Sequence, residues 1–187
     1  MNQTKEAVEQ RFGSSRTSLP SLIADLASNS GATRLQARRA LVELNGQAVP
    51  ALILALQDSS WRVRWEAAKA LSEIHDPSSA PALVGALEDK RSDIRWLAAE
   101  GLIAIGHAAL PPLLQALIHR KDSTWMREGA HHVLVFMPDE GIQKVLTPVV
   151  QAIEGIEPVI ETPLAAQVAL DALDRAKQKR TAFPHSG

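Results

Sequence analysis

Glu128, His131 and His132 come closest in this sequence to a set of residues that could do chemistry. Spacings of three and four residues place side chains on one side of a helix. A carboxylate and an imidazole placed in this way can hold a metal ion in a helical bundle. Glu100 occupies the position of the preceding repeat that corresponds to His132, so stacked helices would bring a second carboxylate near. These four residues are the candidate metal ligands.

The same pattern has a simpler explanation, a polar pair on a solvated helix surface, and we favour it because such pairs are common on exposed helices. The remaining histidines are scattered over turns and chain ends, where no catalytic triad can be assembled. The sequence has no cysteine, which excludes disulfides, thiolate metal sites and a cysteine nucleophile. We therefore expect no catalytic residue, no metal, no cofactor and no enzymatic activity.

Trp65 and Trp96 occupy equivalent positions in adjacent repeats, on the side of their helices away from the small apolar residues. Two interpretations stay open. The rings can fill the groove between successive helices, or they can form an exposed patch that binds a partner, since tryptophan is enriched in binding hot spots. We expect the packed arrangement for Trp96, beside Leu97 and Ile103, more than for Trp65.

A series of arginines follows the short acidic or polar loops, each five or six residues after an aspartate or asparagine. We expect each guanidinium to bind an acidic side chain or a free helix-end carbonyl, and so to align one repeat on the next. The series consists of Arg34, Arg64, Arg95 and Arg127.

The helical element that positions these residues is the stretch 58–89, DSSWRVRWEAAKALSEIHDPSSAPALVGALED. Val63, Ala67 and Leu71 share one face of a helix with about 3.6 residues per turn. Proline ends that helix at Pro77 and is tolerated in the first turn of a second helix at Pro81. The stretch is therefore a helical hairpin, and it recurs at intervals of about 31 residues.

This hairpin resembles the short HEAT-like repeat of the phycobilisome-lyase type, over roughly residues 19–136. The resemblance implies an all-α fold, a right-handed α-solenoid of about five hairpins of 30–32 residues. First helices would lie on the outer surface and second helices on the inner, concave one. The class includes scaffolds, bilin lyases and a di-iron hydroxylase, so it implies no single function.

The di-iron relatives carry His-Glu pairs in the first helix, just after the repeat arginine. No matching position in this sequence has the histidine, so the resemblance gives no support for a di-iron site. The matching pairs are Leu35-Gln36, Trp65-Glu66, Trp96-Leu97 and Glu128-Gly129.

Four segments are expected along the chain. Residues 1–18 form a polar, partly disordered cap with a degenerate helix near 5–12, and residues 19–136 form the repeat array. Residues 137–180 hold a degenerate repeat, which Pro148 should kink or split, and a closing helix; residues 181–187 form a flexible tail. Without an apolar signal core or a membrane-spanning run, the cytoplasm is the expected location, and no membrane is expected as a partner.

Twenty basic and twenty-one acidic residues give a formal charge of −1, which does not favour nucleic acid as a partner, even for a HEAT-like glycosylase fold. We expect a non-enzymatic protein–protein interaction module or scaffold. Small residues on the second helices leave room for a segment of another protein. The alternative is a bilin-lyase-like or pigment-protein chaperone role, which rests on the resemblance alone. The candidate partner-binding residues are Ala82, Gly85, Pro112, Gln115, Trp65 and Trp96.

Overall fold

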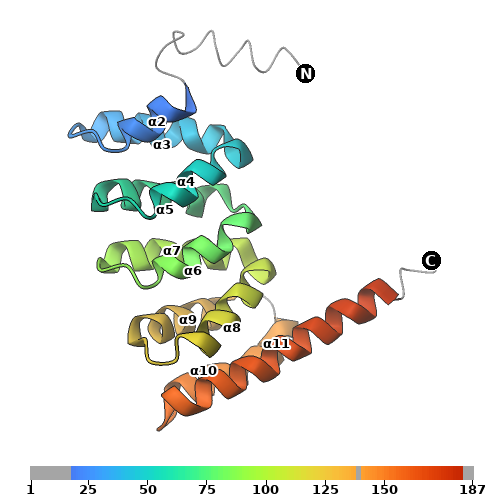
Figure 1. The fold of residues 1–187 in the computed structure, drawn as a ribbon. Helices are drawn as coiled ribbons and strands as arrows, with labels where there is room; N and C mark the ends of the chain where they lie inside the picture. Colours follow the sequence, from blue (N-terminus) through green and yellow to red (C-terminus); the bar gives the residue numbers. More distant parts are fainter. Residues whose placement is uncertain (1–17, 138–139, 183–187) are drawn as a thin grey trace.

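The computed structural model describes residues 18–137 and 140–182, and these residues form helices and turns without a strand. Figure 1 shows the helices paired in hairpins that stack in one column. The predicted all-α solenoid is confirmed. The first helices are α3 (Gly31–Glu43), α5 (Trp61–Ile74), α7 (Ser92–Ile105) and α9 (Thr124–Phe136); the second helices are α2 (Leu19–Asp25), α4 (Val49–Ala55), α6 (Ala80–Ala86) and α8 (Leu110–His119).

The turns inside the hairpins form because one residue in each adopts a positive φ, which ends the first helix. These residues are Asn45, His75 and Gly106, with φ of 51°, 58° and 74°. A short 3-10 turn begins at or just after each of them, η1 (Asn45–Gln47), η2 (Pro77–Ser79) and η3 (Gly106–Ala109). In η2 the Asp76 carboxylate accepts from the Ser78 amide at 2.8 Å. The second helix can then begin with a proline in its first turn.

Close stacking of the hairpins depends on small residues at the contacts between them. A Cβ added to Gly101 would lie 3.0 Å from Leu83 Cδ1 and 3.3 Å from Ser72 Cα. Ala67, Ala70 and their neighbours are likewise buried, so the first helices pack backbone to backbone. The core is a continuous row of buried leucines between the two helix layers, including Leu41, Leu52, Leu71, Leu83, Leu102, Leu113 and Leu134.

The stretch 92–119 is apolar and long enough to cross a membrane by length and composition alone. In the structure it is the third hairpin, α7 and α8, interrupted at Gly106, whose φ is 74° and ψ −141°. Much of it is buried in the core, including Ile94, Leu102 and Leu113. Burial between the helix layers accounts for its apolar composition.

A longer hairpin closes the column, formed by α10 (Glu140–Glu154) and α11 (Pro158–Ala182). The helix α10 packs on α9, and α11 packs on α8 and α10. Pro148 lies inside α10 without splitting it. The closing helix extends to Ala182, beyond the predicted boundary at residue 180. The predicted cap helix near 5–12, the end of the cap before residue 18 and the end of the tail fall outside the described residues.

Candidate functional site

The face formed by the second helices carries four of the predicted partner-binding residues. Ala82 and Gly85 come from α6, and Pro112 and Gln115 come from the equivalent positions of α8. Gly85 and Gln115 are exposed, whereas Ala82 and Pro112 are half-buried. We call this surface, from α2 to α8, the second-helix face.

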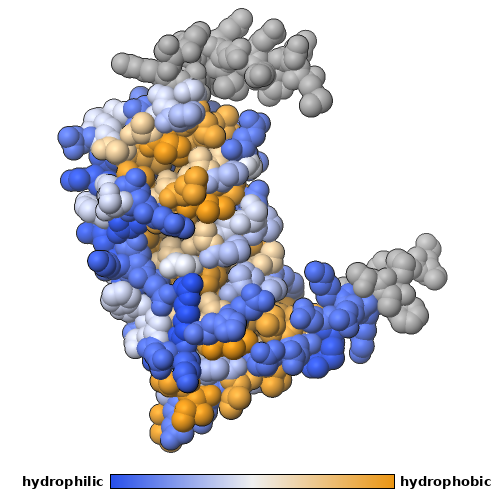
Figure 2. All heavy atoms as spheres, viewed as in Figure 1, coloured by the Kyte–Doolittle hydropathy of each residue, from blue (hydrophilic) through white to orange (hydrophobic). Residues whose placement is uncertain are grey.

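Two features give the second-helix face room for another chain. Apart from its chain neighbours and the backbone of its own helix, no heavy atom lies within 4 Å of where a Cβ of Gly85 would be. One helix earlier, at the position equivalent to Gly85, the side chain of Leu54 is 72% exposed. Figure 2 shows apolar surface running down this side of the column, bordered by hydrophilic residues.

The arginine series forms a regular set of caps. In each repeat the guanidinium Nη1 donates to the backbone carbonyl six residues earlier, in the loop that follows the preceding second helix. The pairs are Arg34 with Ser28 O at 2.8 Å, Arg64 with Asp58 O at 2.8 Å, Arg95 with Asp89 O at 2.9 Å, and Arg127 with Lys121 O. These arginines are structural, as the spacing predicted.

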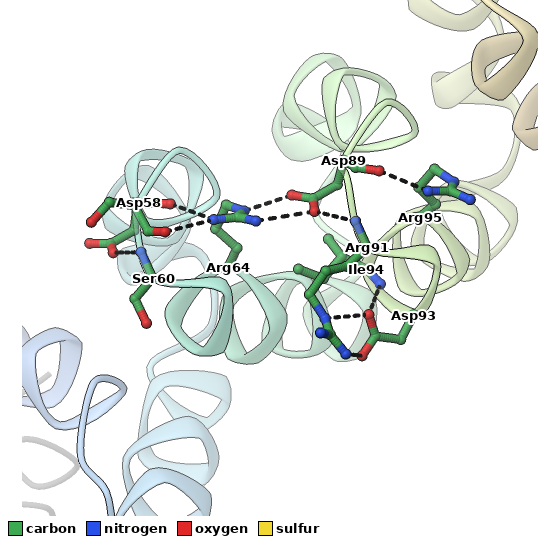
Figure 3. Close-up of polar contacts among 9 residues, drawn as sticks. Asp58, Ser60, Arg64, Asp89, Arg91, Asp93, Ile94 and Arg95 are labelled. Carbon is green, nitrogen blue, oxygen red and sulfur yellow. Dashed lines mark hydrogen bonds and ion pairs between the residues drawn. The ribbon is translucent and has the colours of Figure 1, made fainter.

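Asp89 binds three arginines, Arg64 of α5, Arg91 of the loop and Arg95 of α7 (Figure 3). Its carboxylate accepts from Arg64 Nε at 2.6 Å and Nη2 at 3.2 Å, and from the Arg91 amide at 2.9 Å. Its backbone carbonyl accepts from Arg95. Asp89 therefore joins the second repeat to the third.

Glu66 lies at the centre of the corresponding contact between the first and second repeats. Its side chain is 5% exposed and accepts from Arg34 Nε at 3.2 Å and Arg38 Nη1 at 2.7 Å. The Arg38 guanidinium also lies 5.5 Å from the ring centre of Trp65. Sequence reasoning missed this group, because Glu66 was considered only as a remnant of a metal-binding pair.

The two candidate tryptophans differ from each other. Trp65 is half-buried beneath Arg38, whereas Trp96 is 56% exposed. The expectation that Trp96 is the better packed of the two is wrong. The His132 ring of the next repeat lies beside Trp96, with its ring centre 4.6 Å from that of Trp96 and 4.7 Å from that of Phe136.

The four candidate metal ligands do not come together as one group. His132 Nε2 lies 3.1 Å from Glu100 Oε1 of α7, which confirms the predicted approach of these residues. His131 Nε2 lies 2.7 Å from Glu154 Oε1 of α10 instead. Glu128 lines an open hollow of about 480 Å³ between α9 and the last hairpin. Over residues 18–137 and 140–182 no three histidine, aspartate or glutamate side chains gather in a group that could hold a metal ion.

Comparison with known families agrees with the stacked hairpins. The model of HEAT repeats matches residues 19–103, and the model of the PBS lyase HEAT-like repeat matches residues 94–119. The chain is a HEAT-like repeat protein. No curated protein matches it.

The family matches end at residue 119, the last residue of the third hairpin, although the column continues. The helix α9 keeps the repeat arginine cap at Arg127, and Ser123 caps it by accepting from the Met126 amide at 3.2 Å. The last hairpin has longer helices, and α10 contains no arginine. The array therefore holds four first helices with an arginine cap and one closing hairpin that differs in length.

Asp89 should make the stability of the HEAT-like array depend on pH. Burial alone would raise the pKa of its carboxyl, but hydrogen bonds from Arg64 and the Arg91 amide, with the Arg64 charge, lower that pKa below the ordinary aspartate value. A carboxyl whose pKa is lowered by folding contributes stability above its unfolded pKa of about 3.9 and loses it as pH falls through the folded pKa.

We expect Asp89→Asn to lower the free energy of unfolding by about 2 kcal/mol at pH 7, since it weakens charge-assisted hydrogen bonds. The difference from wild type should be constant above about pH 6 and should shrink below about pH 4. Urea unfolding at several pH values measures both. Asp122→Asn, an exposed loop aspartate, serves as control; an equal effect of the two variants would contradict the assignment.

Trp96→Ala should be mild because the ring is more than half exposed. The contact with His132 contributes about 1 kcal/mol, as expected for one aromatic pair. Removal of a fully buried tryptophan would cost about 3–5 kcal/mol. Denaturant unfolding distinguishes these values, and a loss of the larger size would restore the packed interpretation of Trp96.

Proposed function

We propose that this HEAT-like array is a non-enzymatic protein–protein interaction module that binds a segment of another protein on its second-helix face. HEAT repeats generally mediate protein–protein interaction. The observation that carries the choice of face is the open space at Gly85 next to the exposed Leu54. Apolar contact with room for an inserted side chain is what a bound helix or loop requires.

The described residues offer no competing arrangement for catalysis. Glu100, His131 and His132 are engaged in separate pairs on different helices, and the buried Glu66 is held by two arginines. The polar groups of the array thus align repeats and cap loops. The bilin-lyase-like alternative rests on the family resemblance, and no contact in the structure favours it.

The proposal is tested by capture of partners from the native cell on immobilised protein. Gly85→Arg places a long side chain into open space, so it should fold like wild type and block docking. Leu54→Asp removes the exposed apolar contact. Ala104→Arg adds the same side chain at an exposed position of α7 and is the matched control.

We expect one protein to be retained by wild type and Ala104→Arg and lost with both Gly85→Arg and Leu54→Asp. Circular dichroism and melting temperature verify that the variants are folded. Retention of the same protein by Gly85→Arg would contradict the choice of face. A bound pigment, recognised by its visible absorbance, would favour the alternative role.

A further inference from the structure

The closing helix α11 has a second apolar side that the column does not cover. Thr162, Ala166 and Ala169 are buried against the neighbouring helices. On the opposite side Ile160, Leu164 and Val168, spaced four residues apart, are 60%, 66% and 66% exposed. A soluble helix normally exposes its polar side, so an exposed apolar row of this length indicates a binding surface.

Charged residues flank this row in a fixed order. Glu161, Val168 and Arg175 are spaced seven residues apart, so each lies about 20° from the next around the helix. Glu157 precedes the helix on the acidic side, and Lys179 follows two turns after Ala172 on the basic side; all four charged residues are exposed. The outer side of α11 thus has acidic residues before the apolar row and basic residues at its far end, with the exposed Asp171 and Asp174 between the row and Arg175.

We propose that this outer side binds the α11 helix of a second copy of the chain, in antiparallel orientation about a two-fold axis near Val168. An antiparallel copy places the partner's Arg175 against Glu161, and the same contact repeats on the other side of the axis. Val168 meets its own counterpart, and Leu164 meets the partner's Ala172. A parallel copy would juxtapose like charges.

The shape of the molecule leaves this side accessible. Figure 1 shows the C-terminal half of α11 extending beyond the stacked hairpins, and the side chains from Asp174 to Lys179 are exposed. Along the lower edge in Figure 2, apolar surface gives way to hydrophilic surface towards the C-terminal end of α11. The pairing uses no part of the second-helix face, so it is independent of the proposed function.

The test is sedimentation equilibrium of the full chain over a wide range of concentration. Wild type should form a dimer. Glu161→Arg and Arg175→Glu should each raise the dimer dissociation constant about tenfold or more, because each creates like-charge contacts twice per dimer. The double variant Glu161→Arg with Arg175→Glu reverses both charges and should restore wild-type dimerisation.

Val168→Asp should abolish the dimer, since it places two carboxylates at the axis. Leu54→Asp, an equally exposed apolar position on α4, should leave dimerisation unchanged. Circular dichroism verifies that each variant keeps its helices. The proposal is overturned if wild type is monomeric at every concentration, if Val168→Asp still dimerises, or if the double reversal behaves like the single ones.

Discussion

Glu66→Ala should lower the free energy of unfolding by about 3–5 kcal/mol, the range for breaking a buried ion pair. The Glu66 side chain is 7% exposed and is the shared acceptor of Arg34 and Arg38. Its removal leaves two guanidinium groups close together and largely shielded from water, with the more distant Glu73 carboxylate, 4.0 Å from Arg38 Nε, as the remaining counter-charge. Urea unfolding followed by circular dichroism measures the loss.

The matched control is Glu73→Ala on the same helix. Glu73 lies 3.3 Å from Lys69 in a pair that is about one-third exposed on both sides. Exposed pairs of this type contribute about 0.5 kcal/mol. If Glu66→Ala and Glu73→Ala cost the same, the buried Arg34–Glu66–Arg38 group does not stabilise the first contact between repeats.

The loss at Glu66 should also be local. Stability in a repeat array is approximately a sum over hairpins and the contacts between neighbours. Because Glu66 joins the second repeat to the first, its removal should release α2 and α3 before the rest of the column. Amide hydrogen exchange should therefore accelerate in Gly31–Glu43 and change little in Thr124–Phe136. A uniform increase would contradict this local effect.

Leu102→Ala should cost about 3 kcal/mol, within the range of about 2–5 kcal/mol for a buried leucine, because it leaves a cavity between the helix layers. Leu102 lies in the third repeat and is 0% exposed. Leu54→Ala makes the same change at a side chain that is 72% exposed, and it should alter stability by no more than about 0.5 kcal/mol.

The two leucine variants should separate stability from binding. Leu102→Ala lowers stability through a cavity, whereas Leu54→Ala should weaken partner capture with the unfolding midpoint unchanged. Denaturant unfolding of both proteins measures this contrast. If Leu54→Ala and Leu102→Ala lowered stability equally, the side chain of Leu54 would have to be buried, which would contradict an exposed apolar contact on α4.

The repeat architecture could be predicted from the sequence because its determinants are local. Pro77 ends the first helix of a hairpin and Pro81 lies in the first turn of the second, both within a few residues of the turn. Apolar residues recur about every 3.6 residues along each helix. The arginine caps are also local, since Arg64 binds a carbonyl only six residues earlier. Such contacts repeat in register whenever the hairpin repeats.

The contacts between repeats were less predictable because they depend on what the neighbouring repeat supplies. Trp65 and Trp96 occupy equivalent positions in the sequence, yet their surroundings differ. The Arg38 guanidinium lies over the half-buried Trp65 ring, whereas the exposed Trp96 ring lies beside His132. Glu66 required two arginines from another helix. The available signal was a spacing of about one repeat between a carboxylate and a histidine or arginine. This spacing predicted the approach of Glu100 and His132, but it was not applied to Glu66.

The closing hairpin differs from one of two expected outcomes for a different reason. Pro148 was expected to kink or split a helix, and it does not split α10, which continues through it. Proline removes one backbone hydrogen bond, and burial of Leu146 and Val149 on either side keeps the segment helical. The sequence alone does not show that α9 and α11 pack against α10, so the burial of Leu146 and Val149 could not be predicted from it.

The interaction function is tested most directly by site-specific photo-crosslinking in the native cell. A photoreactive side chain at position 85 would project into open space on the second-helix face, and the same side chain at position 104 of α7 is the control. The account predicts a crosslink to one protein partner from position 85 and none from position 104. A crosslink from position 104 with none from position 85 would contradict it.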